Sequence, residues 1–236
     1  MKIGIMQPYF FPYLGYFSLI KHTDRFILFD TVQFIRHGWI ERNRILNPNG
    51  DWQYIKVPLV KFSQSTIIKD IQINNNFGWR EKIFAQLQHY KKKAPNYTIV
   101  IELLEDIFSA DYFDIVSLDL NSLIKVADYL GIDTSIEVFS SMGLAIEKAN
   151  APDEWALNIC KALGNVEEYW NPPGGASFFD RVKYENAGIN LKFHSIKLTE
   201  YIQRQSIFIP GLSIIDVMMF NSINDINEML DNYEFV

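Results

Sequence analysis

The sequence predicts an α/β protein with a three-layer, Rossmann-like parallel sheet and a helical insertion. Two short apolar runs, residues 2–7 (KIGIMQ) and 25–30 (RFILFD), flank a segment with helical periodicity at residues 12–24. A strand–helix–strand unit this compact implies parallel strands joined by a right-handed crossover. Strand and helix patterns alternate again in the C-terminal half of the chain, which supports the same class.

The first sixty residues contain the elements that define this unit. The predicted helix at 12–24 carries Pro12 in its first turn, where a missing N–H costs nothing. Its apolar face is expected to consist of Leu14, Phe17, Leu19 and Ile20. Residues 52–60 and 65–73 are predicted as a third and a fourth strand.

Helical patterns dominate the middle of the chain. Apolar residues recur at helical spacing in segments 78–94, 97–109 and 111–131, and Gly131 closes the last of them. No linker, repeat or compositional shift marks a boundary. We therefore expect a single domain over residues 1–236, with residues 78–131 as a helical insertion or lid.

The C-terminal half returns to alternating elements. We expect, in order, a strand at 134–140, a helix at 151–164, a strand at 166–170, a loop at 171–177, a helix at 178–188, a strand at 189–196 and helices from residue 212 onward. Pro152 and Asp153 mark the start of the first of these helices and Gly164 its end.

Composition and charge exclude several classes of protein. The 236 residues are 48% hydrophobic and 21% charged, which is typical of a folded globular chain. The net charge of −6 argues against a nonspecific nucleic-acid binder. The single cysteine, Cys160, allows no internal disulfide and fits a reducing compartment. With no signal-peptide pattern and no apolar run long enough to span a bilayer, we expect a cytoplasmic protein.

Two polar residues follow the first two predicted strands. Gln7 ends the first strand and Asp30 ends the second. Because ligands bind beyond the carboxyl ends of parallel strands, both side chains are expected to point toward one crevice. The alternative is structural, with Gln7 as a turn former and Asp30 as a capping residue.

A basic cluster comes directly after Asp30. Residues 33–45 hold four basic side chains and three stacking or hydrogen-bonding ones: Arg36, His37, Arg42, Arg44, Gln33, Trp39 and Asn43. Arginine forks suit carboxylate or phosphate groups, so the cluster favours anion binding, for instance of a nucleotide or sugar phosphate. The alternative is an exposed strand or helix whose arginines pair with nearby acids.

Two later segments offer weaker candidates. The loop 171–177 (NPPGGAS) places Gly174 and Gly175 before a predicted helix, where free N–H groups could hold an anion. A tight turn is the alternative. Near the C-terminus, Tyr201 and Gln203 are possible ligand contacts. Ser213 and Asp216 have the spacing of a helix capping box.

Metal binding and covalent catalysis have little support in the sequence. The four histidines are scattered without ligand spacing, so no metal site is predicted. Cys160 lies among apolar residues and is expected to be a core thiol. No nucleophile-elbow motif of a serine hydrolase is present.

The chain resembles the WbqC-like family of bacterial proteins. The segments that carry this resemblance are QPYFFPYLGYFSLI (7–20), DRFILFDTVQF (24–34), GWIERNRI (38–45), WQYIKVPL (52–59), YWNPPGGASF (169–178) and YIQRQSIFIPGLSIIDVMMFN (201–221). They span nearly the whole chain in order. The resemblance implies a role in surface polysaccharide biosynthesis of the O-antigen type.

The opening also resembles HIGH-type nucleotidyltransferases such as pantothenate synthetases. In YLGYFSLI (13–20), Gly15 occupies the place of the motif glycine, where a nucleotide phosphate would approach a helix N-terminus. Tyr13 and Tyr16 replace both motif histidines, and a neutral tyrosine supplies no positive charge. The resemblance implies a nucleotidyltransferase-like sheet and makes ATP a possible cofactor.

Together these observations predict an enzyme that joins an acyl or aminoacyl group to the amine of a nucleotide-linked amino sugar. ATP or an already activated carrier would supply the acyl group. The alternative is a non-catalytic nucleotide-sugar binder or glycan-assembly partner. The expected catalytic residues are Asp30, Tyr13 and Tyr16, and the expected substrate-binding residues are Gln7, Gly15, Gln33, Arg42, Asn43, Arg44, Gly174, Gly175, Tyr201 and Gln203.

Overall fold

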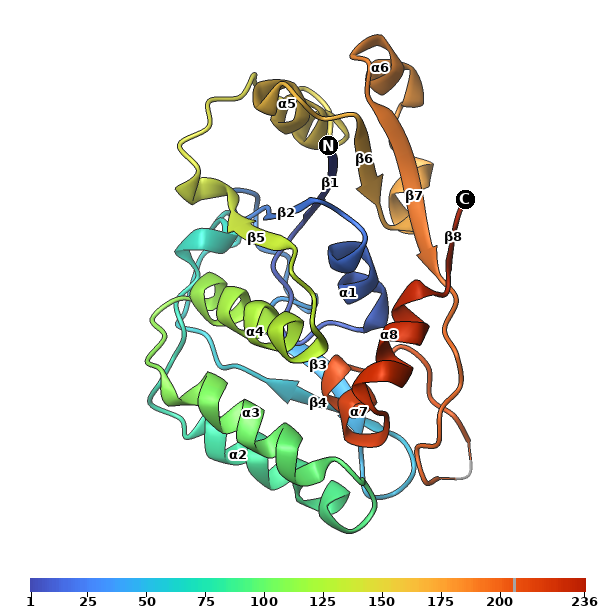
Figure 1. Cartoon of the computed structure of the whole chain (residues 1–236). Helices are drawn as coiled ribbons and strands as arrows, with labels where there is room; N and C mark the ends of the chain where they lie inside the picture. The colour runs from blue at the N-terminus through green and yellow to red at the C-terminus, as the bar shows by residue number, and fades with distance from the viewer. Residues whose placement is uncertain (206) are drawn as a thin grey trace.

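A six-stranded sheet forms the centre of the computed structural model, which describes residues 1–205 and 207–236 (Figure 1). Its strands lie in the order β5-β2-β1-β6-β7-β8, and only β8 runs antiparallel to its neighbour. The bounds are β1 Lys2–Met6, β2 Arg25–Leu28, β5 Ser135–Val138, β6 Glu168–Asn171, β7 Asn190–Ile196 and β8 Tyr233–Phe235. Numbered along the chain within this sheet, the order is that of the doubly wound Rossmann fold, so the predicted class is confirmed.

Helices cover both faces of the sheet. The helices α1 (Leu14–Lys21), α4 (Ile115–Leu130), α7 (Ile214–Phe220) and α8 (Ile223–Asp231) pack on one face, and α5 (Glu154–Leu163) and α6 (Arg181–Asn186) pack on the other. Successive strand residues alternate between these layers. In β2, Phe26 belongs to the first core and Ile27 to the second.

A long segment separates the neighbouring strands β2 and β5. It contains the antiparallel pair β3 (Arg42–Leu46) and β4 (Trp52–Lys56), the 3-10 turns η1 (Ile68–Asp70) and η2 (Gln88–Lys92), and the helices α2 (Trp79–Leu87), α3 (Tyr97–Ser109) and α4. Figure 1 shows α2 and α3 lying beyond β3 and β4, away from the central sheet. The predicted strand at 52–60 thus belongs to a separate small sheet.

The predicted strand at 65–73 is wrong. Two isolated bridges flank the η1 turn there, joining Gln33 with Ile67 and Leu59 with Ile73. Ile68 and Ile71, three residues apart, are both fully buried. This spacing fits a 3-10 turn, in which residues three apart eclipse, better than the alternation of a strand.

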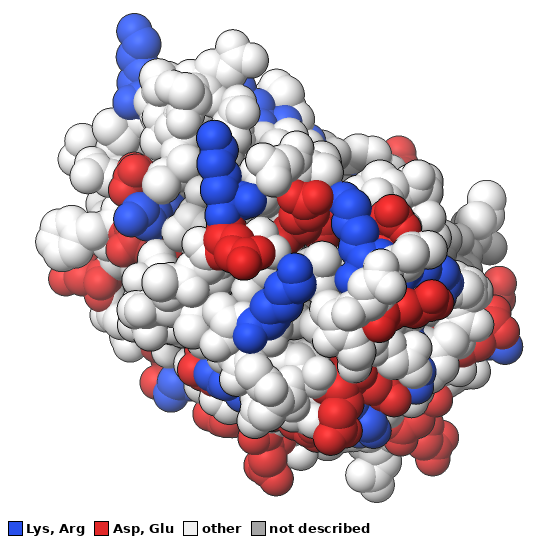
Figure 2. All heavy atoms as spheres, turned by 90° about the horizontal axis from the view of Figure 1, so that it is seen from above, with Lys and Arg blue, Asp and Glu red and all other residues white. Residues whose placement is uncertain are grey.

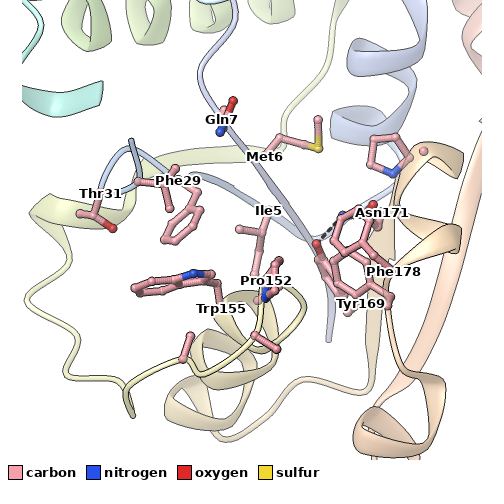
Figure 3. Close-up of a pocket in the computed structure, with 18 of the residues that line it drawn as sticks. Ile5, Met6, Gln7, Phe29, Thr31, Pro152, Trp155, Tyr169, Asn171 and Phe178 are labelled. Atoms are coloured by element: carbon pink, nitrogen blue, oxygen red, sulfur yellow. Dashed lines mark hydrogen bonds between the residues drawn. The ribbon is translucent and has the colours of Figure 1, made fainter. Parts of the chain in front are cut away.

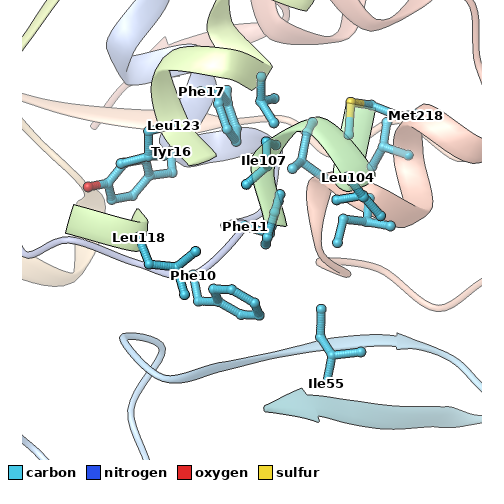
Figure 4. Close-up of a cluster of buried hydrophobic side chains, with 14 of the residues drawn as sticks. Phe10, Phe11, Tyr16, Phe17, Ile55, Leu104, Ile107, Leu118, Leu123 and Met218 are labelled. Carbon is cyan, nitrogen blue, oxygen red and sulfur yellow. The ribbon is translucent and has the colours of Figure 1, made fainter. Parts of the chain in front are cut away.

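One apolar core joins the start of the chain to the middle helices. Figure 4 shows Phe11 and Phe17 close to Leu104 and Ile107 of α3, with Met218 of α7 beside them. The helices over residues 78–131 therefore pack in the same core as α1. Whether they move as a lid stays a prediction.

The remaining differences lie in the C-terminal half of the chain. Residues 173–177 of the predicted loop form a 3-10 turn, η4 (Pro173–Ser177), and β5 leads into another, η3 (Phe139–Ser141). The final residues form β8 rather than continuing as helix.

Among residues 1–205 and 207–236, no helix is long and apolar enough to cross a membrane. Figure 2 shows basic and acidic side chains interspersed on the face seen from above.

Candidate functional site

Two neighbouring cavities open at the carboxyl ends of β1 and β6. These adjacent strands form the switch point of the sheet, because the connections on either side of them pass over opposite faces. The first cavity has a volume of about 930 Å³ and the second about 360 Å³. Met6, Tyr9 and Pro172 line both, so a single wall divides them.

The first cavity is aromatic and carries no charge. Figure 3 shows Phe29 and Trp155 on one side, and Tyr169, Asn171 and Phe178 on the other. The ring centres of Phe29 and Trp155 are 5.6 Å apart. Among the described residues that line it, none has a charged side chain. Such a surface suits a flat or apolar ligand held in place by a few neutral hydrogen bonds.

Neutral polar groups lie at the strand ends beside this cavity. The Thr31 hydroxyl has no hydrogen-bond partner among the described residues. Asn171 donates from Nδ2 to the Tyr169 hydroxyl at 2.6 Å. A Cβ on Gly175 would lie 2.3 Å from Asn171 Oδ1, so only glycine lets η4 pack this closely against β6.

The second cavity lies at the start of α1 and combines phenols with one arginine. Tyr9, Tyr13 and Tyr16 line it, and burial raises the pKa of all three hydroxyls. They are therefore neutral hydrogen-bonding groups at physiological pH. Tyr16 donates to the Gln7 carbonyl at 2.8 Å, which fixes the turn between β1 and α1.

Arg44 supplies the charge of the second cavity. Its guanidinium carbon lies 5.4 Å from the ring centres of both Trp39 and Trp52, and Nη2 donates to the Gly211 carbonyl at 3.2 Å. The buried Nε–H has no partner in the described part of the chain. A guanidinium held between two rings is suited to a carboxylate or phosphate oxygen.

Comparison with known proteins places the chain in a family. The model of the WbqC-like protein family matches residues 7–228. The chain belongs to this family. The WbqC-like chain is also similar to a protein of Mycobacterium tuberculosis named "Uncharacterized protein Rv1507c", with 27% identity over 223 residues that cover 93% of each chain. No solved structure matches it significantly.

The WbqC-like structure brings eight of the predicted site residues to the two cavities. Gln7, Gln33, Gly174 and Gly175 line the first, and Tyr13, Tyr16, Asn43 and Arg44 line the second. Several also have structural partners. Asn43 is buried and donates to the carbonyls of Phe10 and Phe11, and Gln33 donates to the Gln64 carbonyl.

Asp30 does not face the crevice as predicted. Its side chain is 1% exposed, and its two oxygens accept hydrogen bonds from the Ser140 N–H at 3.0 Å and hydroxyl at 2.5 Å. The carboxylate thereby ties η3 to the end of β2. Asp30 therefore has a structural role, the alternative that the sequence left open. It lacks the access that a base for a substrate amine would need.

Gly15 and Arg42 are also placed differently from the prediction. A Cβ on Gly15 would lie 2.4 Å from the Tyr13 ring, so this ring covers the backbone where a phosphate was expected. Arg42 donates to the carbonyls of His37 and Gly38 and stacks on the Tyr54 ring at 4.1 Å. It lines neither cavity and instead holds the preceding loop.

One of the two glycine N–H groups of the predicted anion loop is already paired. The Gly175 N–H donates to the Pro172 carbonyl at 3.1 Å, so it is not free. The following helix, α6, begins only at Arg181, and Asp180 caps it by accepting from the Val182 N–H. A carboxylate already occupies the position where an anion would bind.

Tyr201 and Gln203 lie outside both cavities and bind Asp216 instead. The Asp216 carboxylate is fully buried and accepts from the hydroxyls of Tyr90 and Tyr201, each at 2.5 Å, and from Gln203 Nε2 at 3.4 Å. Ser213 caps α7 as predicted, accepting from the Ile215 N–H. Asp216 serves this buried network and not a capping box.

Several lining residues were missed. Asn171 ends β6 just as Gln7 follows β1, so the rule that selected Gln7 could also have selected it. Trp155 and Phe178 carried no such signal, because their approach to the crevice depends on how α5 and η4 pack. Cys160 is buried as expected, and burial raises its pKa to about 12. Within the described residues, no three His, Cys, Asp or Glu side chains gather as a metal site would require.

Proposed function

We propose that this WbqC-like protein binds a nucleotide-linked amino sugar and transfers an acyl or aminoacyl group to its amine during bacterial surface polysaccharide synthesis. The paired cavities carry this proposal. They share the wall of Met6, Tyr9 and Pro172 at the switch point of a Rossmann-like sheet, where nucleotides commonly bind. The family resemblance supplies the glycan context.

Each cavity suits a different part of such a substrate. The uncharged first cavity accommodates a nucleoside, with Phe29 and Trp155 offering aromatic surface to the base. Arg44 and the phenols of the second cavity suit phosphate and sugar oxygens. A ligand that crosses the shared wall would place its sugar between the two.

The transfer would depend mainly on positioning. The sugar amine attacks the carbonyl carbon of an activated acyl group, the C–N bond forms, the bond to the leaving group breaks, and the amine proton leaves to solvent. The hydroxyls of Tyr9 and Tyr13 can donate hydrogen bonds to the developing oxyanion. No carboxylate or histidine of the described residues lines either cavity, so the amine must arrive deprotonated.

That lack of a lining base favours a second candidate, a non-catalytic nucleotide-sugar binder. Both candidates require binding in the paired cavities, and they differ only in turnover. Assays with an acyl thioester, and with free acid plus ATP, therefore separate them. Product without ATP indicates a carrier donor, product only with ATP indicates a ligase, and binding without product across donors indicates the binder.

Binding itself is tested by calorimetry with UDP-N-acetylglucosamine, UDP-glucose, dTDP-glucose and the free nucleotides. Phe178→Ala removes an exposed ring from the first cavity, and we expect about fivefold weaker binding from the loss of about 1 kcal/mol of stacking. Phe113→Ala, which removes an exposed ring that lines neither cavity, is the matched control and should change nothing.

Arg44→Gln should weaken binding of the phosphate-bearing ligands by about tenfold or more, through loss of a charge-assisted hydrogen bond. Equal affinity of the wild type and both cavity variants for every nucleotide sugar would show that the cavities are not the site. Failure of the whole panel to bind would refute the proposal.

A further inference from the structure

A third pocket lies on the opposite side of the loop that contains residues 33–36 and borders the first cavity. Its lining includes Arg36, His37, Glu41, Lys56, Lys61 and Phe62. Its volume is about 230 Å³. We call it the basic pocket. Gln33 and Ile35 line the first cavity, whereas Phe34 and Arg36 line the basic pocket. The loop is thus a partition between two separate sites.

The cations of the basic pocket have no acidic partners. Among the described residues, Arg36, Lys56 and Lys61 form no ion pair with a carboxylate. The chain as a whole is acidic, with a net charge of −6. Three unpaired cations around one small pocket produce a local positive potential that attracts an anionic group.

The loop that carries Arg36 and His37 is held in place. The Arg36 guanidinium lies 4.5 Å over the Phe62 ring, and its Nη2 donates to the Phe62 carbonyl at 3.3 Å. His37 has a φ of 64°, a conformation that costs energy for a residue with a side chain. Arg42 stabilises it by donating to the His37 carbonyl. Arg36 is therefore pre-positioned, which lowers the entropic cost of binding.

An unpartnered carboxylate lies against the same pocket. Glu41 is only 4% exposed, and its Oε2 has no hydrogen-bond partner in the described chain. Asp119 of α4 is fully buried and also lacks partners there. Burial raises the pKa of Asp119 well above its ordinary value, and the charge of Glu41 raises it further. Because burial disfavours the charged form, Asp119 is held as the neutral acid.

Glu41 is the acidic side chain that lines the basic pocket, so a cationic donor bound there would find a carboxyl group as its partner. The protein's own lysines and arginine do not bond to it. A donor from outside the chain, with an anionic group that reaches Arg36, Lys56 and Lys61, would satisfy both halves of the pocket.

We propose that the basic pocket binds a compact zwitterion, with its phosphate or carboxylate on Arg36, Lys56 and Lys61 and its ammonium group on Glu41. Amino acids and phosphorylated amines share this chemistry, and the volume limits the ligand to about their size. The pocket shares no lining residue with the paired cavities. This inference therefore does not depend on the proposed function.

Calorimetry with three probes tests the inference on the intact chain. O-phosphoethanolamine carries both groups, ethyl phosphate lacks the ammonium, and β-alanine replaces phosphate with carboxylate. We expect O-phosphoethanolamine to bind at least tenfold more tightly than ethyl phosphate. Tighter binding of β-alanine than of O-phosphoethanolamine would identify the amino acid as the ligand class, and the reverse order would identify the phosphorylated amine.

Variants then locate the site. Lys61→Gln should weaken O-phosphoethanolamine binding by about five- to tenfold. Lys92→Gln, which removes another exposed lysine far along the chain, should leave it unchanged. Glu41→Gln should abolish the preference for O-phosphoethanolamine over ethyl phosphate.

Two results would overturn the inference: equal binding of O-phosphoethanolamine and ethyl phosphate to the wild type, or no effect of Lys61→Gln. Both measurements use the wild type or a variant with one exposed substitution. They therefore test the inference even if Glu41→Gln fails to fold. Nucleotide-sugar binding, measured in the same preparations, reports separately on the paired cavities.

Discussion

The substitution Asp216→Asn probes the buried network that joins α7 to the segment around Tyr201. Asp216 accepts two 2.5 Å hydrogen bonds from Tyr90 and Tyr201. Burial nevertheless raises its pKa from 3.8 to about 6, against the opposing effect of the tyrosine and Gln203 hydrogen bonds. The ionised carboxylate is thus less favourable in the folded protein than in the unfolded chain.

The sign and size of the effect follow from this shift. The folded-state pKa is raised, so the group contributes stability that is fully present below about pH 4 and is lost as the pH rises through about 6. The difference between about 6 and 3.8 is about 2 pH units, or roughly 3 kcal/mol. Asparagine has nearly the same shape and can bond both tyrosines, but it does not titrate.

Urea denaturation followed by tryptophan fluorescence at pH 4, 5, 6 and 7 measures the effect. The stability of the wild type relative to Asp216→Asn should fall by roughly 2.5 kcal/mol from pH 4 to pH 7. Asp225→Asn is a control that should show a nearly constant difference from the wild type over this range. Hydrogen bonds from Ser222 lower the pKa of Asp225, so its contribution is lost only on acidification below about pH 4. A difference between the wild type and Asp216→Asn that stays constant over this range would refute the reasoning.

Three further predictions concern the turn after β1 and the core. Gly15→Ala forces a Cβ to within 2.4 Å of the Tyr13 ring, so we expect a loss of about 1–3 kcal/mol in urea denaturation and altered binding in the second cavity. Asn43→Ala removes two hydrogen bonds to the backbone carbonyls of Phe10 and Phe11. It should lower the free energy of unfolding by about 2–4 kcal/mol in the same measurement. Cys160 should resist iodoacetamide at pH 8 in the folded chain and react in urea, as mass spectrometry would show, because its pKa is about 12.

The sequence was informative where structure depends on neighbouring residues. The apolar runs and helical periods predicted the strands and helices of the central sheet, because burial on both faces imposes these patterns. The rule that ligands bind beyond strand ends correctly placed Gln7 at a cavity. Local patterning also predicted the cap at Ser213.

Long-range partners decided the predictions that failed. Asp30 turns inward because Ser140, 110 residues away, bonds both of its oxygens. Tyr201 and Gln203 turn inward because Asp216 lies beneath them. A polar side chain at a favoured position looks the same in sequence whether its partner is a ligand or another part of the protein.

The position of β1 between β2 and β6 has a consequence for synthesis on the ribosome. The walls of the first cavity come from residues 5–35, 149–156 and 169–179. At ordinary elongation rates, roughly 10–30 s separate the emergence of the first wall from that of the last. During this interval the edge of β1 that pairs with β6 has no partner strand. The face of β1 that carries Ile3 and Ile5 is not yet covered by α5. The nascent chain therefore exposes an unpaired strand edge that chaperones can recognise, and the first cavity cannot form before residue 179 has emerged.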